Sequence, residues 1–471
     1  VSELHGEVSR RMWQSLWPSL SEAEVPIDHV TNGVHTDTWI HPGLAALLDQ
    51  HLAPNWREAI DERQTWAGVV DIPADALWAQ HQAAKMEMVA LVRERTAAQL
   101  LRTGAAPADV NAAATGLDPH ALTIGFARRF ATYKRATLLF RNPERLKRIL
   151  NDPERPVQIV FAGKAHPADE PGKAFIQSVY QFSRQPGFAG KIIFVEDYDA
   201  NIGRHLVAGV DVWLNNPRRP LEASGTSGEK AGLNGAPNFS VLDGWWREGY
   251  DGTNGWAIGA EREYPNEAAQ DEADALSLYA ILENQIVPAY YRRNEAGIPE
   301  EWLKVMRASI MTVGPDYSFD RMLKEYVAKF YAPADKLGRQ VGDDAYAGAR
   351  ALTAWEARVK DGWAQVSVSA AGPERGEMTI GAPLVVRASL RTGVLPPEDI
   401  AVELVCVRES SGRAIEAVAL PMRLTGRADG VYQYEGAFDV PDSGRFAYGV
   451  RARPDHANLP NPFAAYLMTW A

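Results

Sequence analysis

A group of cationic side chains lies where a short apolar run ends near the middle of the sequence. The run Ala121–Ala127 leads directly into four cations within eight residues, namely Arg128, Arg129, Lys134 and Arg135. Arginine offers a planar fork of N–H donors and lysine a compact charge, and both bind phosphate oxygens. We expect a helix to begin near Tyr133, so that its free backbone N–H groups point towards the same place. The cluster is typical of a phosphate site, although a solvated basic helix start has the same composition.

A second segment, LEASGTSGEKAGLNG at 221–235, combines small residues with one lysine. It follows the apolar run Asp211–Asn216 and is expected to enter a helix. Its glycines let backbone amides approach a ligand closely, but its spacing is not that of a Walker A loop. Lys230, among small residues and beside a cluster of cations, would have a lowered pKa, which suits covalent attachment to an aldehyde. Considered alone, however, an ordinary surface lysine is the better interpretation.

The elements around these segments alternate between apolar and amphipathic stretches. Nearly continuous apolar runs occupy 121–129, 157–165, 191–198 and 211–216, and helical patterns separate them at 133–150, 171–184 and 201–209. Such alternation predicts a parallel sheet with helices on both faces. Ligands bind at the carboxyl ends of the strands in these sheets, so both segments are expected at that edge.

Three regions follow from the pattern. Residues 1–118 are mostly helical, with a loop at Thr31–Pro42; residues 119–365 form the α/β lobe; residues 366–471 alternate in the manner of an all-β sandwich. The fold class is therefore α/β with a doubly wound parallel sheet, flanking helices and a C-terminal β-sandwich. Helices are also expected at Asp274–Arg293, kinked at Pro288, and at Tyr317–Phe330 and Ala345–Trp363.

Bulk composition excludes some classes of function. A net charge of −11 argues against broad affinity for nucleic acid or anionic membranes. We see no signal peptide and no apolar run of 18 residues, so we expect a cytoplasmic protein. The single cysteine, Cys406, allows no intramolecular disulfide and is expected to be a small buried hydrophobe.

Several long motifs together resemble the glycogen (α-glucan) phosphorylase family. EASGTSGEKAGLNG is similar to its cofactor-lysine motif, GFARRFATYKRA to its phosphate-binding motif, and HVTNGVHTDTW to a loop that contacts sugar and cofactor. FVEDYDANIGRHLVAGVDVWLNN also follows the family, and VLDGWWREGYDGTNGWAIG resembles its short bacterial and archaeal branch. The resemblance covers roughly residues 1–330. It implies a two-lobed GT-B type glycosyltransferase, of which this chain would be the C-terminal portion.

The resemblance also implies a cofactor, pyridoxal 5'-phosphate. Lys230 would hold it covalently. Thr226 and Ser227 would contact its phosphate, and Trp39 and Tyr198 would flank its ring. Glu229 stands where many members carry Met.

The implied substrates are an α-1,4-glucan, such as glycogen or maltodextrin, and inorganic phosphate. Arg129 and Lys134 would bind the phosphate, with Arg128 beside them. The terminal glucose would be held by Glu222, Ser224, Gly225 and Asn32. The implied reaction is retaining phosphorolysis to α-D-glucose 1-phosphate, in which the cofactor phosphate acts as a proton relay, with no metal. Glu222 is then a sugar clamp and not an acid.

The chain begins VSELHGEVSRRMW, without Met, and is expected to be a fragment that lacks an N-terminal lobe needed for activity. The helix at Tyr317–Phe330 would then expose an apolar patch. A homo-oligomer is possible. The alternatives are a glycogen synthase-like transferase that uses a nucleotide sugar, a non-catalytic glucan-binding fragment, and, with little support, a pyridoxal enzyme acting on amino acids.

Overall fold

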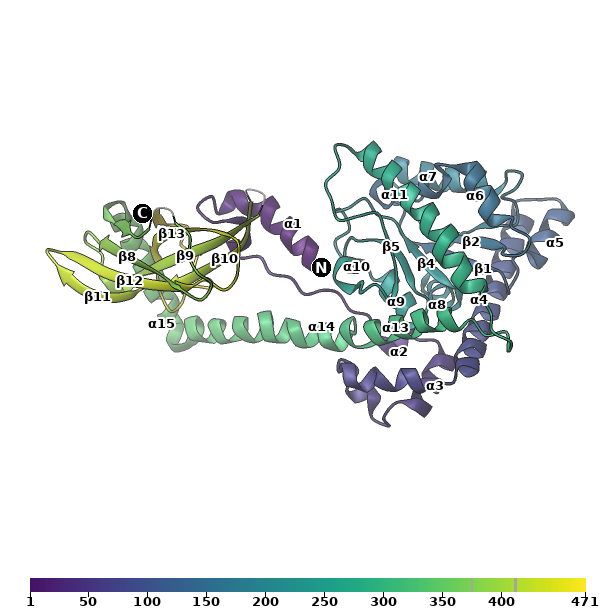
Figure 1. The fold of residues 1–471 in the computed structure, drawn as a ribbon, viewed down its shortest axis with the longest axis horizontal. Helices are drawn as coiled ribbons and strands as arrows, with labels where there is room; N and C mark the ends of the chain where they lie inside the picture. Colours follow the sequence, from purple (N-terminus) through teal and green to yellow (C-terminus); the bar gives the residue numbers. More distant parts are fainter. Residues whose placement is uncertain (374–375, 411–412) are drawn as a thin grey trace. The chain divides into compact units, whose positions relative to one another are not determined.

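A six-stranded parallel sheet forms the centre of the first of two compact units in the computed structural model, which describes residues 1–373, 376–410 and 413–471 (Figure 1). This unit comprises Val1–His5 and His29–Glu325. The strands lie in the order β3-β2-β1-β4-β5-β6. Their bounds are β1 Leu122–Ala127, β2 Val157–Ala162, β3 Ile192–Val195, β4 Val212–Asn215, β5 Asn238–Val241 and β6 Gly255–Ile258.

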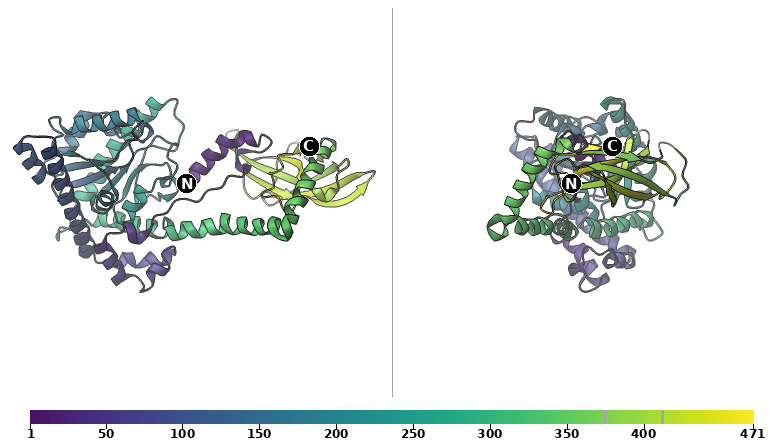
Figure 2. Two further views of the ribbon diagram at one scale, coloured as in Figure 1. Left: turned by 180° about the vertical axis from the view of Figure 1, so that it is seen from behind. Right: turned by 90° about the vertical axis from the view of Figure 1, so that its left-hand side faces the viewer.

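The sheet is covered on both faces. Every residue of β1, β2, β4 and β5 is buried, as their apolar composition requires. Helices α4 and α8 pack together on one side, and α6, α7 and α11 contact the strands from the other (Figures 1 and 2). The predicted doubly wound fold is confirmed. The sequence did not reveal β5 and β6, because Asn238 and Ser240 interrupt the apolar pattern of β5 and a glycine, Gly255, opens β6.

The helices of this unit vary greatly in length, from one turn to eight. Two of them, α1 Glu3–Trp13 and α14 Phe319–Tyr326, extend beyond the limits of the unit. The bounds of the others are α2 Thr36–Trp39, α3 Pro42–His51, α4 Ala74–Arg102, α5 Pro107–Thr115, α6 Pro143–Leu150, α7 Glu170–Ser183, α8 Ala200–Gly209, α9 Ser227–Leu233, α10 Trp246–Gly249, α11 Glu267–Ile281, α12 Val287–Tyr291 and α13 Glu300–Asp316. A π-helical turn, η7 Leu282–Ile286, joins α11 to α12 just before Pro288, where we predicted a kink.

The prediction of a helix directly after the cationic cluster is wrong. Only two short 3-10 turns occur there, η5 Thr132–Lys134 and η6 Leu138–Phe140, and the next α-helix begins at Pro143. The break lies at Arg135, whose backbone is left-handed with φ 48°. Its buried guanidinium donates to the Asn216 carbonyl at 2.8 Å and to Asp274 at 2.8 Å, and these bonds hold the chain in a turn. No α-helix begins within residues 128–142, so the helix N–H groups expected directly after the cluster are not found there, and binding by this segment depends on its side chains.

A buried group of charged side chains lies at the amino ends of the strands, at the opposite end of the sheet from the cationic cluster. Asp211 directly precedes β4 and is fully buried. Its carboxylate accepts from Lys85 Nζ at 2.5 Å, from the Thr123 N–H at 2.7 Å, and contacts His81 Nε2 at 2.9 Å. Lys85 also donates to the Tyr290 hydroxyl at 2.9 Å. The group joins α4 and α12 to the starts of β1 and β4.

The second unit, Gly6–Asp28 with Tyr326–Ala471, contains two antiparallel sheets of four strands. Their orders are β10-β9-β13-β14 and β11-β12-β8-β7. Inward-facing positions alternate along β8, as a sandwich requires. The strand bounds are β7 Ser367–Ala371, β8 Pro383–Arg391, β9 Ile400–Ser410, β10 Arg413–Pro421, β11 Arg423–Ala428, β12 Val431–Asp439, β13 Arg445–Pro454 and β14 Thr469–Trp470. The predicted β region is confirmed, and Cys406 is buried within it.

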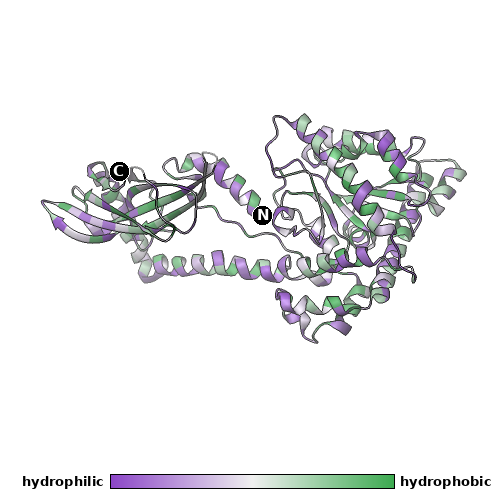
Figure 3. Ribbon diagram, in the orientation of Figure 1, coloured by the Kyte–Doolittle hydropathy of each residue, from purple (hydrophilic) through white to green (hydrophobic). Residues whose placement is uncertain are grey.

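Helix α15, Ala332–Gly362, packs against this sandwich through Trp355 and Val359. By packing, residues 326–365 therefore group with the strands, whereas the sequence placed them with the α/β lobe. The three-part division at residues 118 and 365 remains a prediction about separate roles. Hydrophobic residues colour much of the central sheet, whereas the strands of the second unit mix hydrophobic and hydrophilic residues (Figure 3).

An apolar stripe is exposed along α14 and the π-helical turn η8, Val327–Tyr331. Phe319, Leu323, Val327 and Phe330 are each between 38% and 45% exposed. This agrees with the patch expected at Tyr317–Phe330. Across the part of the chain that the structure describes, no helix has the length and hydropathy needed to span a bilayer.

Candidate functional site

The cationic cluster and the small-residue segment meet at the carboxyl edge of the sheet. Arg128 follows β1, and the segment 221–235 follows β4, which is the neighbour of β1. The strand order reverses between these two strands. Ligands bind at such a switch point in open α/β sheets, so the predicted location is confirmed for both segments.

Glu222 is the centre of the cluster. Its carboxylate accepts from Lys134 Nζ at 3.2 and 3.0 Å and forms a short ion pair with an Arg128 terminal nitrogen. All three side chains are buried. Arg129, in contrast, is exposed and lies beside Tyr133. The structure thus brings together Arg128, Lys134 and Glu222 and leaves Arg129 outside this group.

The charges of this group depend on one another. Burial, and then the neighbouring Arg128, lower the pKa of Lys134 to about 8. Burial alone would raise the pKa of Glu222, but the charges and hydrogen bonds of Arg128 and Lys134 outweigh it and lower this pKa. Glu222 is therefore ionised near neutral pH, when Lys134 is still mostly protonated.

Asp243 positions the backbone of Glu222, and sequence reasoning missed it. It follows β5, and its carboxylate accepts from the Glu222 N–H at 3.0 Å and from the Gly244 N–H at 2.8 Å. Burial raises the pKa of Asp243 to about 7. Its only sequence signal is its place after β5, in which the polar residues Asn238 and Ser240 interrupt the apolar pattern.

Lys230 lies against an aromatic surface. It is in α9, as predicted, and its Nζ lies 3.8 Å from the centroid of the Trp39 ring. A Cβ atom on Gly203 would meet the Tyr198 hydroxyl at 3.0 Å and Trp39 at 3.8 Å, so this glycine leaves room for both rings. The structure therefore brings Lys230, Trp39 and Tyr198 into one region.

The pKa of Lys230 is lowered, as predicted, but for a different reason. Burial is the main cause, and the adjacent Glu229 opposes it. The cationic cluster is not among the causes, so that part of the expectation is wrong. Glu229 is itself fully buried, burial raises its pKa well above the usual range, and neither carboxylate oxygen has a partner among the described residues.

The turn before α9 presents small polar groups. Ser224 is buried, and its hydroxyl has no partner within the described parts of the chain. Gly225 has φ +79°, a conformation that favours glycine. Thr226 occupies the N-cap position of α9, where its side chain makes no capping hydrogen bond. The Ser227 hydroxyl accepts from Trp213 Nε1 at 3.1 Å, which leaves its own hydrogen available.

The Thr31–Asn32 loop is held by α14. Arg321 donates to the Thr31 carbonyl at 2.9 Å and to the Asn32 carbonyl at 3.1 Å. The Asn32 side chain accepts from the amino group of Val1 at 3.3 Å. Gly33 passes so close to Ser318 that a Cβ atom would lie 2.1 Å from its carbonyl oxygen.

Asn234 connects α9, which carries Lys230, to the segment that carries Trp39, and sequence reasoning assigned it no role. Its side-chain amide donates to the Trp39 carbonyl and to the Lys230 carbonyl, both at 2.8 Å, and accepts from the His41 N–H at 2.7 Å. One side chain thus fixes α9 against the segment that carries Trp39. The signal was available in the single asparagine of EASGTSGEKAGLNG.

Comparison with known proteins identifies the family. The sequence pattern described as Carbohydrate phosphorylase matches residues 1–250, more than half of the 471 residues. The chain belongs to the carbohydrate phosphorylase family. A second pattern, described as Glycogen phosphorylase C-terminal domain, matches residues 363–471 and covers the β strands of the second unit.

Individual carbohydrate phosphorylases agree over most of the chain. A maltodextrin phosphorylase of Thermococcus litoralis is 42% identical over 476 residues, covering 100% of this chain and 55% of its own length. A glycogen phosphorylase of Aquifex aeolicus is 48% identical, covering 70% of this chain and 47% of its own length. One from Mycobacterium bovis is 40% identical, with coverages of 98% and 53%. The chain spans about half the length of these curated relatives.

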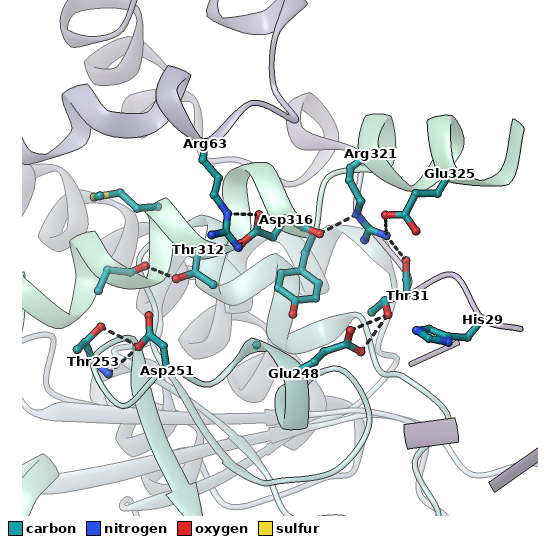
Figure 4. Close-up of a pocket in the computed structure, with 14 residues that line it drawn as sticks. His29, Thr31, Arg63, Glu248, Asp251, Thr253, Thr312, Asp316, Arg321 and Glu325 are labelled. Carbon is teal, nitrogen blue, oxygen red and sulfur yellow. Dashed lines mark hydrogen bonds and ion pairs between the residues drawn. The ribbon is translucent and has the colours of Figure 1, made fainter. Parts of the chain in front are cut away.

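A polar pocket of about 840 Å³ lies beside the Thr31–Asn32 loop, and Figure 4 shows the residues that line it. Thr31 donates to Glu248 at 2.9 Å on one wall, and Arg63 pairs with Asp316 at 2.8 Å on another. None of the twelve predicted site residues lines it, but Thr31 is the neighbour of Asn32. The pocket and the predicted sugar site therefore share the Thr31–Asn32 loop as a wall.

Proposed function

We propose that this chain provides the cofactor- and phosphate-binding part of an α-glucan phosphorylase. The whole protein would release terminal α-1,4-linked glucose from glycogen or maltodextrin as α-D-glucose 1-phosphate, with retention. The observation that carries the proposal is Lys230 Nζ, half-buried with a lowered pKa and 3.8 Å from the Trp39 ring, in a unit that also holds a buried pair of cations. A synthase that uses a nucleotide sugar has no need of such an amine.

The residues around Lys230 suit pyridoxal 5'-phosphate. The amine would hold its aldehyde, and the rings of Trp39 and Tyr198 would flank its flat ring. The hydroxyls of Thr226 and Ser227 would bind its phosphate. When bound, the cofactor supplies a phosphate group that relays a proton to inorganic phosphate. A site for anions and hydroxyls is supported by buried donors that have no partner among the described residues, namely Arg128 Nε, one Arg128 terminal nitrogen and Ser224 Oγ.

The cations would hold inorganic phosphate beside the cofactor phosphate. Two phosphates repel each other, and only clustered positive charge makes their approach tolerable. Arg128 and Lys134 now share the carboxylate of Glu222, which occupies the position expected of an oxyanion. Phosphate would take over part of these bonds, and the exposed Arg129 would add a further charge.

Glu222 would bind glucose hydroxyls. Because its pKa is lowered, it accepts hydrogen bonds at neutral pH and donates no proton. Ser224, Gly225 and Asn32 would hold other hydroxyls. In phosphorolysis the glycosidic C1–O bond breaks, a phosphate oxygen bonds to C1 on the same face, and the phosphate proton passes to the leaving oxygen. No pair of protein carboxylates of the glycosidase kind is then needed.

Two assays test the proposal. Reconstitution of the chain with pyridoxal 5'-phosphate should give a near-ultraviolet absorbance band that Lys230→Ala loses and that Lys304→Ala, at an exposed lysine, retains. Release of glucose 1-phosphate should be measured with the protein extended to the length of its relatives. A band that persists in Lys230→Ala, or glucosyl transfer from a nucleotide sugar with no phosphorolysis, would contradict the proposal.

Further parts of the proposal concern the whole protein. We propose that activity requires the N-terminal lobe that these relatives' greater length provides for, and that the protein is cytoplasmic. A homo-oligomer remains a prediction that size-exclusion chromatography with light scattering would test.

A further inference from the structure

The turn between β5 and α10 contains a buried carboxylate that is not neutralised by any described cation. Asp243 is 3% exposed and forms no ion pair with a described residue. A buried carboxylate without a cation is costly, so its presence calls for an explanation. One of its oxygens accepts from the Glu222 N–H at 3.0 Å and the other from the Gly244 N–H at 2.8 Å. The carboxylate therefore joins two turns that follow the neighbouring strands β4 and β5.

The same turn also contacts the backbone of Ser224. The Trp245 N–H donates to the Ser224 carbonyl at 2.9 Å. Gly244 has φ +58°, and a Cβ atom there would lie 2.2 Å from the Ser224 carbonyl oxygen, so a glycine is needed for this approach. Trp245 is 3% exposed and packs edge-on against Tyr317, with ring centroids 4.6 Å apart. The turn at residues 243–245 is thus anchored in the core.

A further contact holds the residue between Glu222 and Ser224. Ser2 is fully buried, and it donates to the Ala223 carbonyl through its N–H at 2.8 Å and through its hydroxyl at 3.0 Å. Three successive residues, 222–224, are therefore each fixed through a backbone group. The Ser224 hydroxyl and the N–H groups of Ser224 and Gly225 donate to no described residue, so they stay available to a ligand.

We propose that Asp243 and Trp245 are positioning residues for glucose recognition, which fix the backbone of residues 222–224 so that its free polar groups meet the sugar hydroxyls. Neither residue needs to touch the sugar. A binding group must be held within about 0.5 Å of its productive place, and a backbone fixed at three points meets that demand. The inference rests on the proposed function, because it explains how the glucose-binding residues of that site are held.

Loss of this support should affect sugar and phosphate in different ways. Glu222 would bind glucose hydroxyls, but it also competes with phosphate for Arg128 and Lys134. A loosened turn would place the sugar-binding groups poorly and would also weaken that competition. Affinity for glucose should therefore fall while affinity for phosphate does not. A general loss of packing would lower both affinities.

Hydrogen exchange on the present chain tests the contact itself. In Asp243→Asn, the side chain has only one acceptor oxygen for two N–H groups, so exchange within residues 221–226 should become about tenfold faster or more. Mass spectrometry of peptides would show this change, and the fully buried strand β2 should keep its protection. Unchanged exchange at residues 221–226, or an equal loss in β2, would overturn the proposal.

Titration calorimetry tests recognition in the protein extended to the length of its relatives, with pyridoxal 5'-phosphate bound. Asp243→Asn should raise the Kd for D-glucose about tenfold and should raise the Kd for phosphate by no more than about twofold. Gly244→Ala should give the same difference between the two ligands, because its methyl group would displace Ser224. Equal weakening of both ligands, or unchanged glucose affinity, would overturn the proposal.

Two matched controls lie in the next turn of the chain. Asp251 also accepts from two backbone N–H groups, those of Thr253 at 2.7 Å and Asn254 at 3.1 Å, but it is exposed. Gly252 also has a positive φ, with open space around it. Asp251→Asn and Gly252→Ala should leave both affinities unchanged. Because binding is measured without turnover, a protein that shows the expected difference but no phosphorolysis would contradict only the proposed function.

Discussion

At the scale of single residues, the site depends on one carboxylate that serves two cations. Lys134 and Arg128 are buried beside Glu222, and each would be an isolated buried charge without it. Isolated buried charges are costly, so the carboxylate stabilises the free protein. The same contact means that phosphate must compete with Glu222 for its donors.

Replacing this carboxylate separates the two effects. Glu222→Gln should lower the free energy of unfolding by about 3 kcal/mol, because it leaves two buried cations without an anion. Phosphate should then raise the melting temperature more in the variant than in the unmodified chain, since its intramolecular competitor is gone. Thermal unfolding with and without phosphate, against chloride of equal ionic strength, measures both. Equal phosphate effects in the two proteins would refute the competition.

The pKa of Lys134 predicts how anion binding depends on pH. Because this pKa is about 8, the charge is present below pH 8 and lost as the pH rises through it. Phosphate affinity should fall roughly tenfold or more as the pH rises through the pKa of Lys134, since a charge-assisted hydrogen bond contributes about 1.5–3 kcal/mol. Titrations at several pH values would show the step. Lys134→Arg should remove it, and a step that survives this change would have another origin.

At the scale of elements, the sequence predicted what apolar patterning controls. The runs that became β1 and β2 are continuous and fully buried, and were found within a few residues. The helix predicted from Tyr133 failed because the buried side chain of Arg135 bonds to Asn216 and Asp274, and no local pattern reports such distant partners. The strand β11 lies inside the predicted β region, but all six of its residues are exposed, so no alternation of buried and exposed residues marks its bounds.

The site residues also divide into those that a local sequence motif reveals and those whose roles depend on distant contacts. Lys230 was predictable because its motif is local, and its place in α9 is confirmed. The roles of Asn234 and Asp243 depend on contacts with His41 and Glu222, which only the folded chain brings near. The cause of the lowered pKa of Lys230 is burial, which a sequence does not display.

Asn234 should be the residue that keeps α9 and the Trp39 segment in register. Asn234→Ala removes three hydrogen bonds and leaves part-buried backbone groups without these partners, which should cost about 1–3 kcal/mol of stability. Pyridoxal 5'-phosphate should also bind more weakly, because Trp39 is no longer fixed beside Lys230. Denaturant unfolding and the absorbance titration check these outcomes. The matched change Asn294→Ala, at an exposed turn, should leave cofactor affinity unchanged.

At the scale of the whole molecule, the buried charged residues that stabilise the fold and the residues of the candidate site lie at opposite ends of the strands of one sheet. The group around Asp211 lies at the amino ends of the strands, and the cationic cluster lies at their carboxyl ends. Substitutions at the first edge should therefore change stability without changing the chemistry at the second.

Asp211→Asn tests this separation. It should cost about 3–5 kcal/mol, because the fully buried amine of Lys85 loses the carboxylate that opposes the lowering of its pKa by burial. The double variant Asp211→Asn with Lys85→Met should recover much of the loss. Asp49→Asn, which breaks the exposed pair with Arg57, should cost less than about 1 kcal/mol. Circular dichroism during urea unfolding gives all three values, and an equal loss in the single and double variants would contradict this account.

The bonds from Arg321 to the Thr31–Asn32 loop have a consequence for biosynthesis. The two partners are separated by 290 residues along the chain. At about 5–20 residues per second, a ribosome needs roughly 15–60 seconds to make that length. During this interval the loop emerges without the helix that fixes it. Nascent chains stalled before Arg321 should therefore be cleaved by protease near Asn32, and chains released beyond it should resist.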